Sequence, residues 1–270
     1  WSPIAPPSLD WRENTPVSIE SQDIYFSTTD GLAESEYIFL HGNRLIERWQ
    51  NQSSNQPFVV AELGLGTGLN AAMTITRWLS FKKPKQILHY IALEREPLGL
   101  NQIQRALSRW PELKPVVDRL LCRWPDPLPG CHRRTFSDWG LTIDFWWEDA
   151  GAVLTDLASH GRRWVNAWYL DGFAPSRQVG PWRTDIYEAM AKISHRSATF
   201  ATFTSAGNVK RGLQNAGFDV NKRPGFAEKR DALIGHFRTS SAERAFLTPW
   251  DLNPYPATFD SAVVVGAGLA

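Results

Sequence analysis

The sequence predicts an α/β fold with a mostly parallel sheet that carries helices on both faces. Apolar runs of strand length alternate with helix-compatible runs along most of the chain, and this order gives parallel strands joined by crossover helices. The clearest pair is an apolar run at 58–63 followed, after three glycines, by a helical pattern at 70–80. The strands are nearly continuous in apolar residues, as expected for a sheet covered on both sides.

The remaining elements repeat this order. Pro97 suits the first turn of a helix, and Gly217 is typical of the residue that follows a helix end. Residues 23–27 and 37–40 fit either a strand or a helix. We expect further strands at 87–94, 141–147, 165–170, 198–204 and 232–237, and further helices at 97–110, 181–193 and 209–216.

The chain divides into a main domain and flanking segments. The main domain is predicted to span residues 58–250, and residues 1–57 are predicted to be an N-terminal extension packed on it. Several prolines keep the start of that extension irregular. Residues 251–260 are predicted to be a linker. Residues 261–270 form an apolar run with the first two glycines of G-x-G-x-x-G, which predicts the truncated start of a dinucleotide-binding unit.

Composition excludes several classes of protein. The net charge of +1 means that any affinity for nucleic acid must come from a local patch. The two cysteines, Cys122 and Cys131, lack metal-ligand spacing and indicate reduced thiols in a cytoplasmic protein, with one disulfide left open. The six histidines are scattered, so no metal site is expected. No apolar run approaches 18 residues, which argues against a membrane protein.

The glycine-rich loop that follows the first apolar run predicts a small-molecule site. Gly64, Gly66 and Gly68 stand two apart, and glycines let a backbone approach a ligand closely. The preceding acid, Glu62, would repel a pyrophosphate and attract an ammonium group. S-adenosylmethionine (SAM) carries an ammonium and no phosphate, so E-x-G-x-G-x-G favours SAM. A nicotinamide or flavin oxidoreductase is the rival, but it needs G-x-G-x-x-G, and residue 69 is leucine.

Acids at the ends of later strands are candidates for the same site, because ligands of open α/β sheets bind beyond the carboxyl ends of the strands. Glu94 could bind both hydroxyls of a ribose. Asp149, which we prefer to its neighbour Glu148, could accept a hydrogen bond from an adenine amino group. Glu94 also has a plain structural reading, as a solvated strand-end acid paired with Arg95.

Asp171 is the best catalytic candidate. It closes the strand at 165–170 and precedes Gly172, although an acid before glycine is also a common turn signal. Methyl transfer from a sulfonium is an in-line displacement that needs alignment and a nucleophile with a free lone pair. An amine must therefore be neutral, and a nearby carboxylate could accept or orient its proton.

Aromatic and basic residues indicate a nucleic-acid substrate. Phe173, Trp182 and Phe203 could form a wall on which a base stacks, although each ring alone is more often part of a core. Residues 207–238 hold seven Lys or Arg against three Asp or Glu. This basic patch could bind RNA phosphates, or it could be a solvated surface. Its substrate-binding candidates are Lys210, Arg211, Lys229 and Arg230.

The motifs together resemble a known family. The matching segments are 23–27, 31–32, 37–40, 62–70, 124–132, 170–175, 201–207, 211–214, 216–218 and 229–230. They cover nearly the whole chain and are similar to the N-terminal methyltransferase domain of the MnmC family, bifunctional enzymes of bacterial tRNA wobble-uridine modification. The resemblance implies a Rossmann-like class I SAM-dependent methyltransferase fold. It also implies a SAM loop that includes Glu62, Asn70 and the three glycines, completed by Glu94, Asp149 and Asp171.

The resemblance implies one reaction. A methyl group would pass from SAM to the aminomethyl group of 5-aminomethyl-2-thiouridine at the tRNA wobble position (U34), giving 5-methylaminomethyl-2-thiouridine. A C-terminal flavin domain in cis, an oxidoreductase that binds FAD, would do the preceding step in the full-length protein. Two alternatives stay open: a SAM-dependent methyltransferase of another amine, and a catalytically silent tRNA-binding module.

Overall fold

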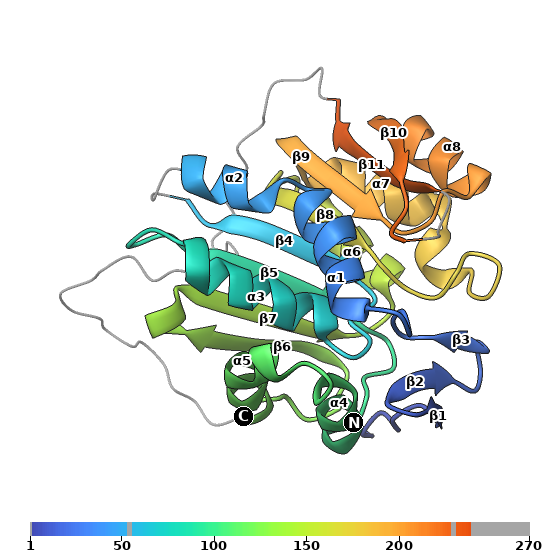
Figure 1. The fold of residues 1–270 in the computed structure, drawn as a ribbon. Helices are drawn as coiled ribbons and strands as arrows, with labels where there is room; N and C mark the ends of the chain where they lie inside the picture. The colour runs from blue at the N-terminus through green and yellow to red at the C-terminus, as the bar shows by residue number, and fades with distance from the viewer. Residues whose placement is uncertain (1, 53–55, 228–230, 239–270) are drawn as a thin grey trace.

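The computed structural model describes residues 2–52, 56–227 and 231–238. Its centre is an eight-stranded sheet with the order β10-β11-β9-β8-β4-β5-β7-β6, and β1-β2-β3 form a separate small sheet (Figure 1). The strands are β1 Leu9–Arg12, β2 Thr15–Ser18, β3 Asp23–Ile24, β4 Phe58–Leu63, β5 Leu88–Leu93, β6 Gly130–Phe136, β7 Leu141–Trp147, β8 Val165–Leu170, β9 Ser194–Thr202, β10 Phe218–Pro224 and β11 Asp231–Phe237. The helices are α1 Gly31–Ser35, α2 Leu45–Asn51, α3 Leu69–Phe81, α4 Leu100–Leu107, α5 Lys114–Leu121, α6 Ala150–Ser159, α7 Thr184–Ile193 and α8 Gly207–Asn215, with a π-helical turn at Glu36–His41.

The five central strands of the large sheet are parallel, and its edges are antiparallel. β9, β8, β4, β5 and β7 pair in parallel. β6 pairs antiparallel with β7 at one edge, and β11 and β10 continue antiparallel from β9 at the other. The predicted α/β class with a mostly parallel sheet is therefore confirmed.

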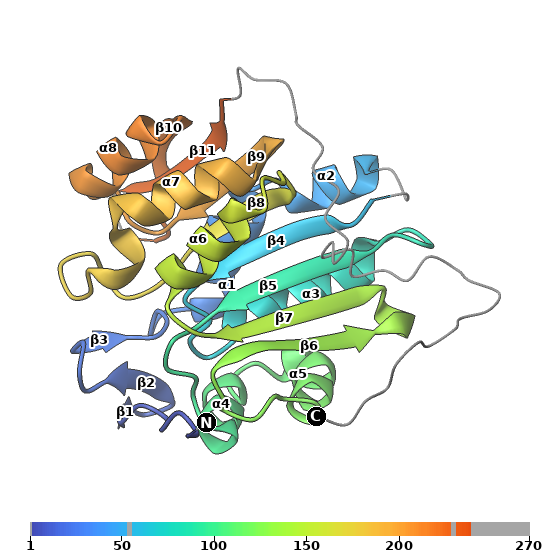
Figure 2. The same ribbon diagram turned by 180° about the vertical axis from the view of Figure 1, so that it is seen from behind.

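Helices cover both faces of the sheet, and alternate side chains of each strand go to opposite faces. On β4, Phe58 and Val60 join the apolar cluster that contains α3 and α5, whereas Val59, Ala61 and Leu63 join the cluster that contains α6 and α7. Figure 1 shows the α3 and α5 side, and Figure 2 shows the side of α6, α7 and α8. By the same alternation, Glu62 faces α3.

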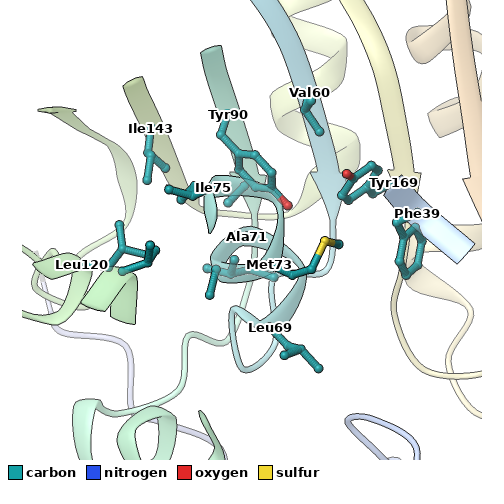
Figure 3. Close-up of a cluster of buried hydrophobic side chains, with 14 of the residues drawn as sticks. Phe39, Val60, Leu69, Ala71, Met73, Ile75, Tyr90, Leu120, Ile143 and Tyr169 are labelled. Carbon is teal, nitrogen blue, oxygen red and sulfur yellow. The ribbon is translucent and has the colours of Figure 1, made fainter. Parts of the chain in front are cut away.

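The layer beneath α3 contains tyrosines as well as aliphatic residues. Val60, Tyr90 and Tyr169 project from three neighbouring strands toward Met73 of α3 (Figure 3). Both tyrosines are fully buried, so each hydroxyl must find a partner inside the protein. Glu62 projects into the same layer, where the Tyr90 hydroxyl is its partner.

The structure adds elements that the sequence analysis did not predict. These include β1, β2, α2, α5, α6, β6 and β10. The strands β6 and β10 are edge strands with polar and charged residues on their exposed sides, so they lack the continuous apolar run of a buried strand. The helix expected at 97–110 is shorter, because Gly99 occupies its N-terminal cap and Gln102 Oε1 accepts a hydrogen bond from the Gly99 amide at 2.8 Å.

The N-terminal segment packs on the sheet rather than beside it. Of the two ambiguous segments, 23–27 starts with β3, and 37–40 lies in the π-helical turn. Asn43 Oδ1 accepts a hydrogen bond of 2.6 Å from Thr199 on β9, and Asn43 Nδ2 donates to the Trp168 carbonyl on β8. The predicted linker at 251–260 and the predicted start of a second domain at 261–270 lie outside the described residues, so the domain boundaries stay predictions.

Three general features complete the fold. Cys122 and Cys131 are both free and exposed. In the described part of the chain, no helix is long and apolar enough to cross a membrane. The same residues hold no group of three or more His, Cys, Asp or Glu side chains that could bind a metal ion.

Candidate active site

A cavity of about 670 Å³ opens at the carboxyl ends of β4, β5, β7 and β8. This is the edge of an open α/β sheet where ligands bind. Among its walls are most of the residues that the sequence analysis selected: Gly64, Gly66, Asn70, Glu94, Asp149, Asp171, Phe173 and Phe203. Glu62, Gly68, Trp182, Lys210 and Arg211 do not line it.

The glycine-rich loop needs its glycines for conformation and for space. Gly64, Gly66 and Gly68 have φ of 85°, 52° and 77°, a region that side chains disfavour. A Cβ on Gly64 would lie 2.7 Å from the Asp171 carbonyl oxygen, so the loop touches the strand end that carries the catalytic candidate. Gly68 sits behind the cavity wall, where it starts α3.

Glu94 ties the loop to the end of β5. Its two carboxylate oxygens accept hydrogen bonds from the amides of Gly66 at 3.0 Å and Glu96 at 2.9 Å. Burial raises the pKa of this carboxyl, and the two amide donors act in the opposite direction. Glu94 lines the cavity as the sequence analysis expected, and its role toward a ribose stays a prediction.

Asp149 caps a helix and also lines the cavity. Its carboxylate caps α6 by accepting from the Ala152 amide at 3.1 Å, and it lies 3.3 Å from Arg183. Glu148, the competing acid, also lines the cavity and accepts from the Asp149 amide. The geometry therefore leaves both acids as candidates for an adenine contact.

Asp171 lies at the end of β8 and faces the cavity. Its Oδ1 accepts from the Gly172 amide at 2.9 Å, and its Oδ2 accepts from Asn70 Nδ2 at 2.7 Å. Asn70 comes from the first turn of α3 and is itself 5% exposed. The catalytic candidate is thus held by its own turn and by a side chain of the glycine-loop helix.

Glu62 does not reach the cavity, although the sequence analysis expected it to attract an ammonium group. Its side chain is fully buried beneath α3, where it accepts hydrogen bonds from Asn70 Nδ2 and from the Tyr90 hydroxyl, both at 2.8 Å. Burial and the nearby Asp171 raise the pKa of Glu62 well above its ordinary value. The strand alternation that buries it could have been read from the sequence, because Val60 and Glu62 must share a face.

The aromatic residues form a corner of the cavity rather than a flat platform. The rings of Tyr25 and Phe173 meet edge to face, with centroids 5.0 Å apart. Trp182 is buried behind them, where its Nε1 donates to the Phe173 carbonyl at 2.9 Å and its ring packs edge-on against Phe203. Trp182 therefore supports the wall and does not form it.

Sequence reasoning missed the N-terminal contribution to the cavity. Asp23, Tyr25, Glu34 and Ser35 all line it. Asp23 Oδ2 accepts from the Ala174 amide at 2.9 Å and so ties β3 to the loop that follows Asp171. A local signal was available, because an Asp before Gly31 is a good helix cap, but nothing in the local pattern says where that helix docks.

Two cations of the basic patch form ion pairs, and a third stacks on an aromatic ring. Lys222 pairs with Asp231 at 2.6 Å, Arg238 pairs with Asp219 at 3.2 Å, and Arg223 stacks on the Tyr37 ring. Lys210 and Arg211 extend from α8, outside the cavity. The other two candidates, Lys229 and Arg230, fall outside the described residues.

Comparisons with known proteins agree with this geometry. A family model described as S-adenosyl-L-methionine-dependent methyltransferase matches residues 111–238. The tRNA 5-methylaminomethyl-2-thiouridine biosynthesis bifunctional protein MnmC of Legionella pneumophila subsp. pneumophila (strain Philadelphia 1) is 38% identical over 283 residues, covering 99% of this chain and 42% of that protein. The protein of the same description from strain Corby is 36% identical, covering 100% of this chain and 43% of that protein. The chain thus spans less than half the length of these relatives.

A solved structure shares the architecture. The crystal structure of MNMC2 from Aquifex aeolicus has a TM-score of 0.68 and 17% identity to this chain, covering 87% of this chain and 72% of that one. At this identity the likeness shows the fold alone. The sheet, the glycine-rich loop and the acid-lined cavity define a SAM-dependent methyltransferase of class I.

The chain belongs to the MnmC family and matches its N-terminal methyltransferase domain. The residues present fit SAM, because among the described residues eight carboxylates and only two arginines, Arg95 and Arg177, line the cavity, which suits the ammonium and sulfonium groups of SAM. Gly64, Gly66, Glu94 and Asp149 would hold it. When bound, SAM supplies an electrophilic methyl group.

Proposed function

We propose that this chain transfers a methyl group from SAM to the aminomethyl group of 5-aminomethyl-2-thiouridine at the tRNA wobble position (U34), giving 5-methylaminomethyl-2-thiouridine. The observation that carries the proposal is the position of Asp171. Its carboxylate faces the cavity, next to the glycine-rich loop and the Phe173 ring. A substrate amine beside that ring would have a proton acceptor within the same wall.

Asp171 would act on the amine and on its proton. Most alkyl amines are protonated at neutral pH, and an ammonium nitrogen has no lone pair for displacement. A carboxylate held by the Gly172 amide and by Asn70 can accept or orient the proton that the amine must lose. The same two donors fix its position, which keeps the nitrogen aligned for an in-line attack.

The proposal extends to partners and location. The substrate would be tRNA, bound in part by Lys210 and Arg211 of α8 and, if they join the same surface, by Lys229 and Arg230. In a full-length protein, a flavin domain with FAD in cis would carry out the preceding step, and the protein would be cytoplasmic. Methylation of another amine remains the second candidate, because the acid-lined cavity suits amines in general.

The experiment is methyl transfer from labelled SAM to tRNA that lacks the final wobble methyl, followed by nucleoside digestion. We expect label in 5-methylaminomethyl-2-thiouridine with the wild type and none with Asp171→Asn. The matched control is Asp118→Asn, which removes an exposed carboxylate on α5 and leaves the cavity intact. Wild-type SAM binding without any labelled nucleoside would contradict the substrate assignment.

A further inference from the structure

Glu62 and Asp171 are two carboxylates bridged by one amide. Asn70 Nδ2 donates to Glu62 at 2.8 Å and to Asp171 at 2.7 Å, which uses both of its hydrogens. Asn70 Oδ1 accepts from the Ser35 hydroxyl of α1, so the amide has a single orientation. Turning it over would place its oxygen against two carboxylates. The buried acid is therefore connected to the acid that faces the cavity.

The opposite end of this connection is also fixed. Glu62 Oε2 accepts from the Tyr90 hydroxyl at 2.8 Å, and Tyr90 is fully buried. In Figure 3, the hydroxyls of Tyr90 and Tyr169 lie in the layer beneath α3. Tyr169 sits beside Glu62 on β8, but its hydroxyl pairs with Thr74 at 3.0 Å. One tyrosine thus contacts Glu62 directly, and its neighbour does not.

The groups around Glu62 carry no compensating positive charge. Tyr90 of β5, Asn70 of α3, Tyr169 of β8 and Asp171 just after β8 surround it, and Glu94 adds a weaker effect of the same negative sign as Asp171. Ser35 and Glu34 of α1 lie on the cavity side of these groups. Within the described residues, Glu62 makes no salt bridge. Its charge state therefore depends on Tyr90, Asn70 and the state of Asp171.

We propose that Glu62 is a positioning residue that acts on Asp171 through Asn70, with the Tyr90 hydroxyl as its fixed donor, and that it does not bind the cofactor. The inference rests on the proposed role of Asp171. A negative Glu62 raises the pKa of Asp171, because two nearby carboxylates resist ionising together. It thereby makes Asp171 a better proton acceptor, and it holds the Asn70 amide that aligns it.

The expected effects have a defined sign. Tyr90→Phe removes the donor that favours charged Glu62, so Glu62 takes up a proton more readily. The negative charge beside Asp171 is then lost, and the pKa of Asp171 falls. Glu62→Gln gives the same direction, since the glutamine oxygen can still accept from Asn70. In both variants we expect kcat to fall about tenfold, with KM for SAM nearly unchanged.

Tyr169→Phe is the matched control. It removes the same hydroxyl from the same buried layer, but the bond it breaks goes to Thr74. The pKa of Asp171 is measured by carbon NMR on protein labelled at aspartate carboxyls, with the resonance identified by its loss in Asp171→Asn. We expect a lower pKa in Tyr90→Phe and Glu62→Gln and no change in Tyr169→Phe. If the pKa of Asp171 were the same in the wild type and all three variants, the inference would be overturned, whatever the thermal stability of the variants.

Binding of SAM to Glu62→Gln provides a second test that needs no turnover. We expect the Kd measured by calorimetry to stay within about threefold of the wild type, because the side chain lies outside the cavity. A loss of affinity above about thirtyfold would make Glu62 a direct ligand of SAM and overturn the proposal. Both tests remain decisive if wild-type protein fails to methylate tRNA, an outcome that contradicts only the proposed substrate.

Discussion

Two buried carboxylates lie on opposite faces of the same sheet, and their surroundings shift their pKa values in opposite directions. On the α3 face, Glu62 has only neutral donors and an acidic neighbour, and its pKa is raised by burial and by Asp171. On the other face, Asp144 of β7 receives two bonds from Arg133, at 2.6 and 2.7 Å, and one of 2.8 Å with His89. Burial acts to raise the pKa of Asp144, but these partners outweigh it and lower the pKa to about 2.

Asp144 is therefore a structural acid with a fixed charge, whereas the charge of Glu62 can change with its surroundings. Asp144 is balanced by a cation and stays charged across the physiological range, with His89 stacked on Trp164 beside it. Glu62 is left without a cation in the part of the chain that the structure describes, and its neighbour faces the cavity. A carboxylate that is not neutralised inside a protein is costly unless its charge can change.

Asp171→Ala should give the largest effect. We expect methyl transfer to fall by about 10³-fold, because the proton acceptor is removed. The thermal unfolding temperature should not fall, since the mutation also removes a negative charge beside Glu62. Single-turnover kinetics and calorimetry measure the two quantities. Wild-type turnover in this variant would end the assigned role of Asp171.

Asp144→Ala should show the opposite pattern. It leaves Arg133 and His89 without their shared partner, so we expect the free energy of unfolding to fall by about 3 kcal/mol. Methyl transfer per folded molecule should stay within about twofold of the wild type, because Asp144 lies on the face away from Asp171. Urea denaturation and active-site titration test this, and a selective loss of kcat would show that the two faces are coupled.

The two acids should also give stability opposite dependences on pH. The lowered pKa of Asp144 contributes about 2 kcal/mol above the ordinary aspartate pKa, and this is lost as pH falls through about 2. The raised pKa of Glu62 favours the folded state below its ordinary value, and that contribution is lost as pH rises through its folded pKa. The free energy of unfolding should therefore differ between Asp144→Asn and wild type in one pH range and between Glu62→Gln and wild type in another. If both variants differed from the wild type in the same way across pH, the two acids would not have opposite pKa shifts.

Charge reversal on α8 should have the smallest effect. Lys210→Glu combined with Arg211→Glu should raise KM for tRNA about tenfold and reduce its salt dependence, with SAM affinity unchanged. Lys114→Glu, an exposed change on α5, is the control. Equal losses of tRNA and SAM affinity would indicate damage to the fold instead of a lost phosphate contact.

The sequence predicted the site residues that stand at the ends of strands. It could not predict which residues of the N-terminal segment pack beside them. Gly64, Glu94 and Asp171 follow apolar runs of strands that pair in parallel, so their meeting at one edge is a consequence of the fold class. Tyr25 and Ser35 come from a segment whose docking depends on long-range contacts, and a local pattern holds no information about those.

Glu62 illustrates a different limit. Its place in the motif is obvious from the sequence, but its function depends on which face of β4 it occupies and on which groups meet it there. The alternation of side chains gives the face. The identity of Tyr90 and Asn70 as its partners requires the register between β4 and β5 and the docking of α3, which only the three-dimensional structure provides.

The bonds between Asn43 and the β8–β9 pair have a consequence for synthesis of the chain. Asn43 and Thr199 are 156 residues apart, so the segment that supplies one wall of the cavity leaves the ribosome long before its anchor. Such distant contacts slow folding, because a long loop must close before they form. The cavity cannot be complete until β9 has been made. We therefore expect a growing chain to gain affinity for SAM in one late step, after residue 202, and not gradually as the glycine-rich loop and the first strands emerge.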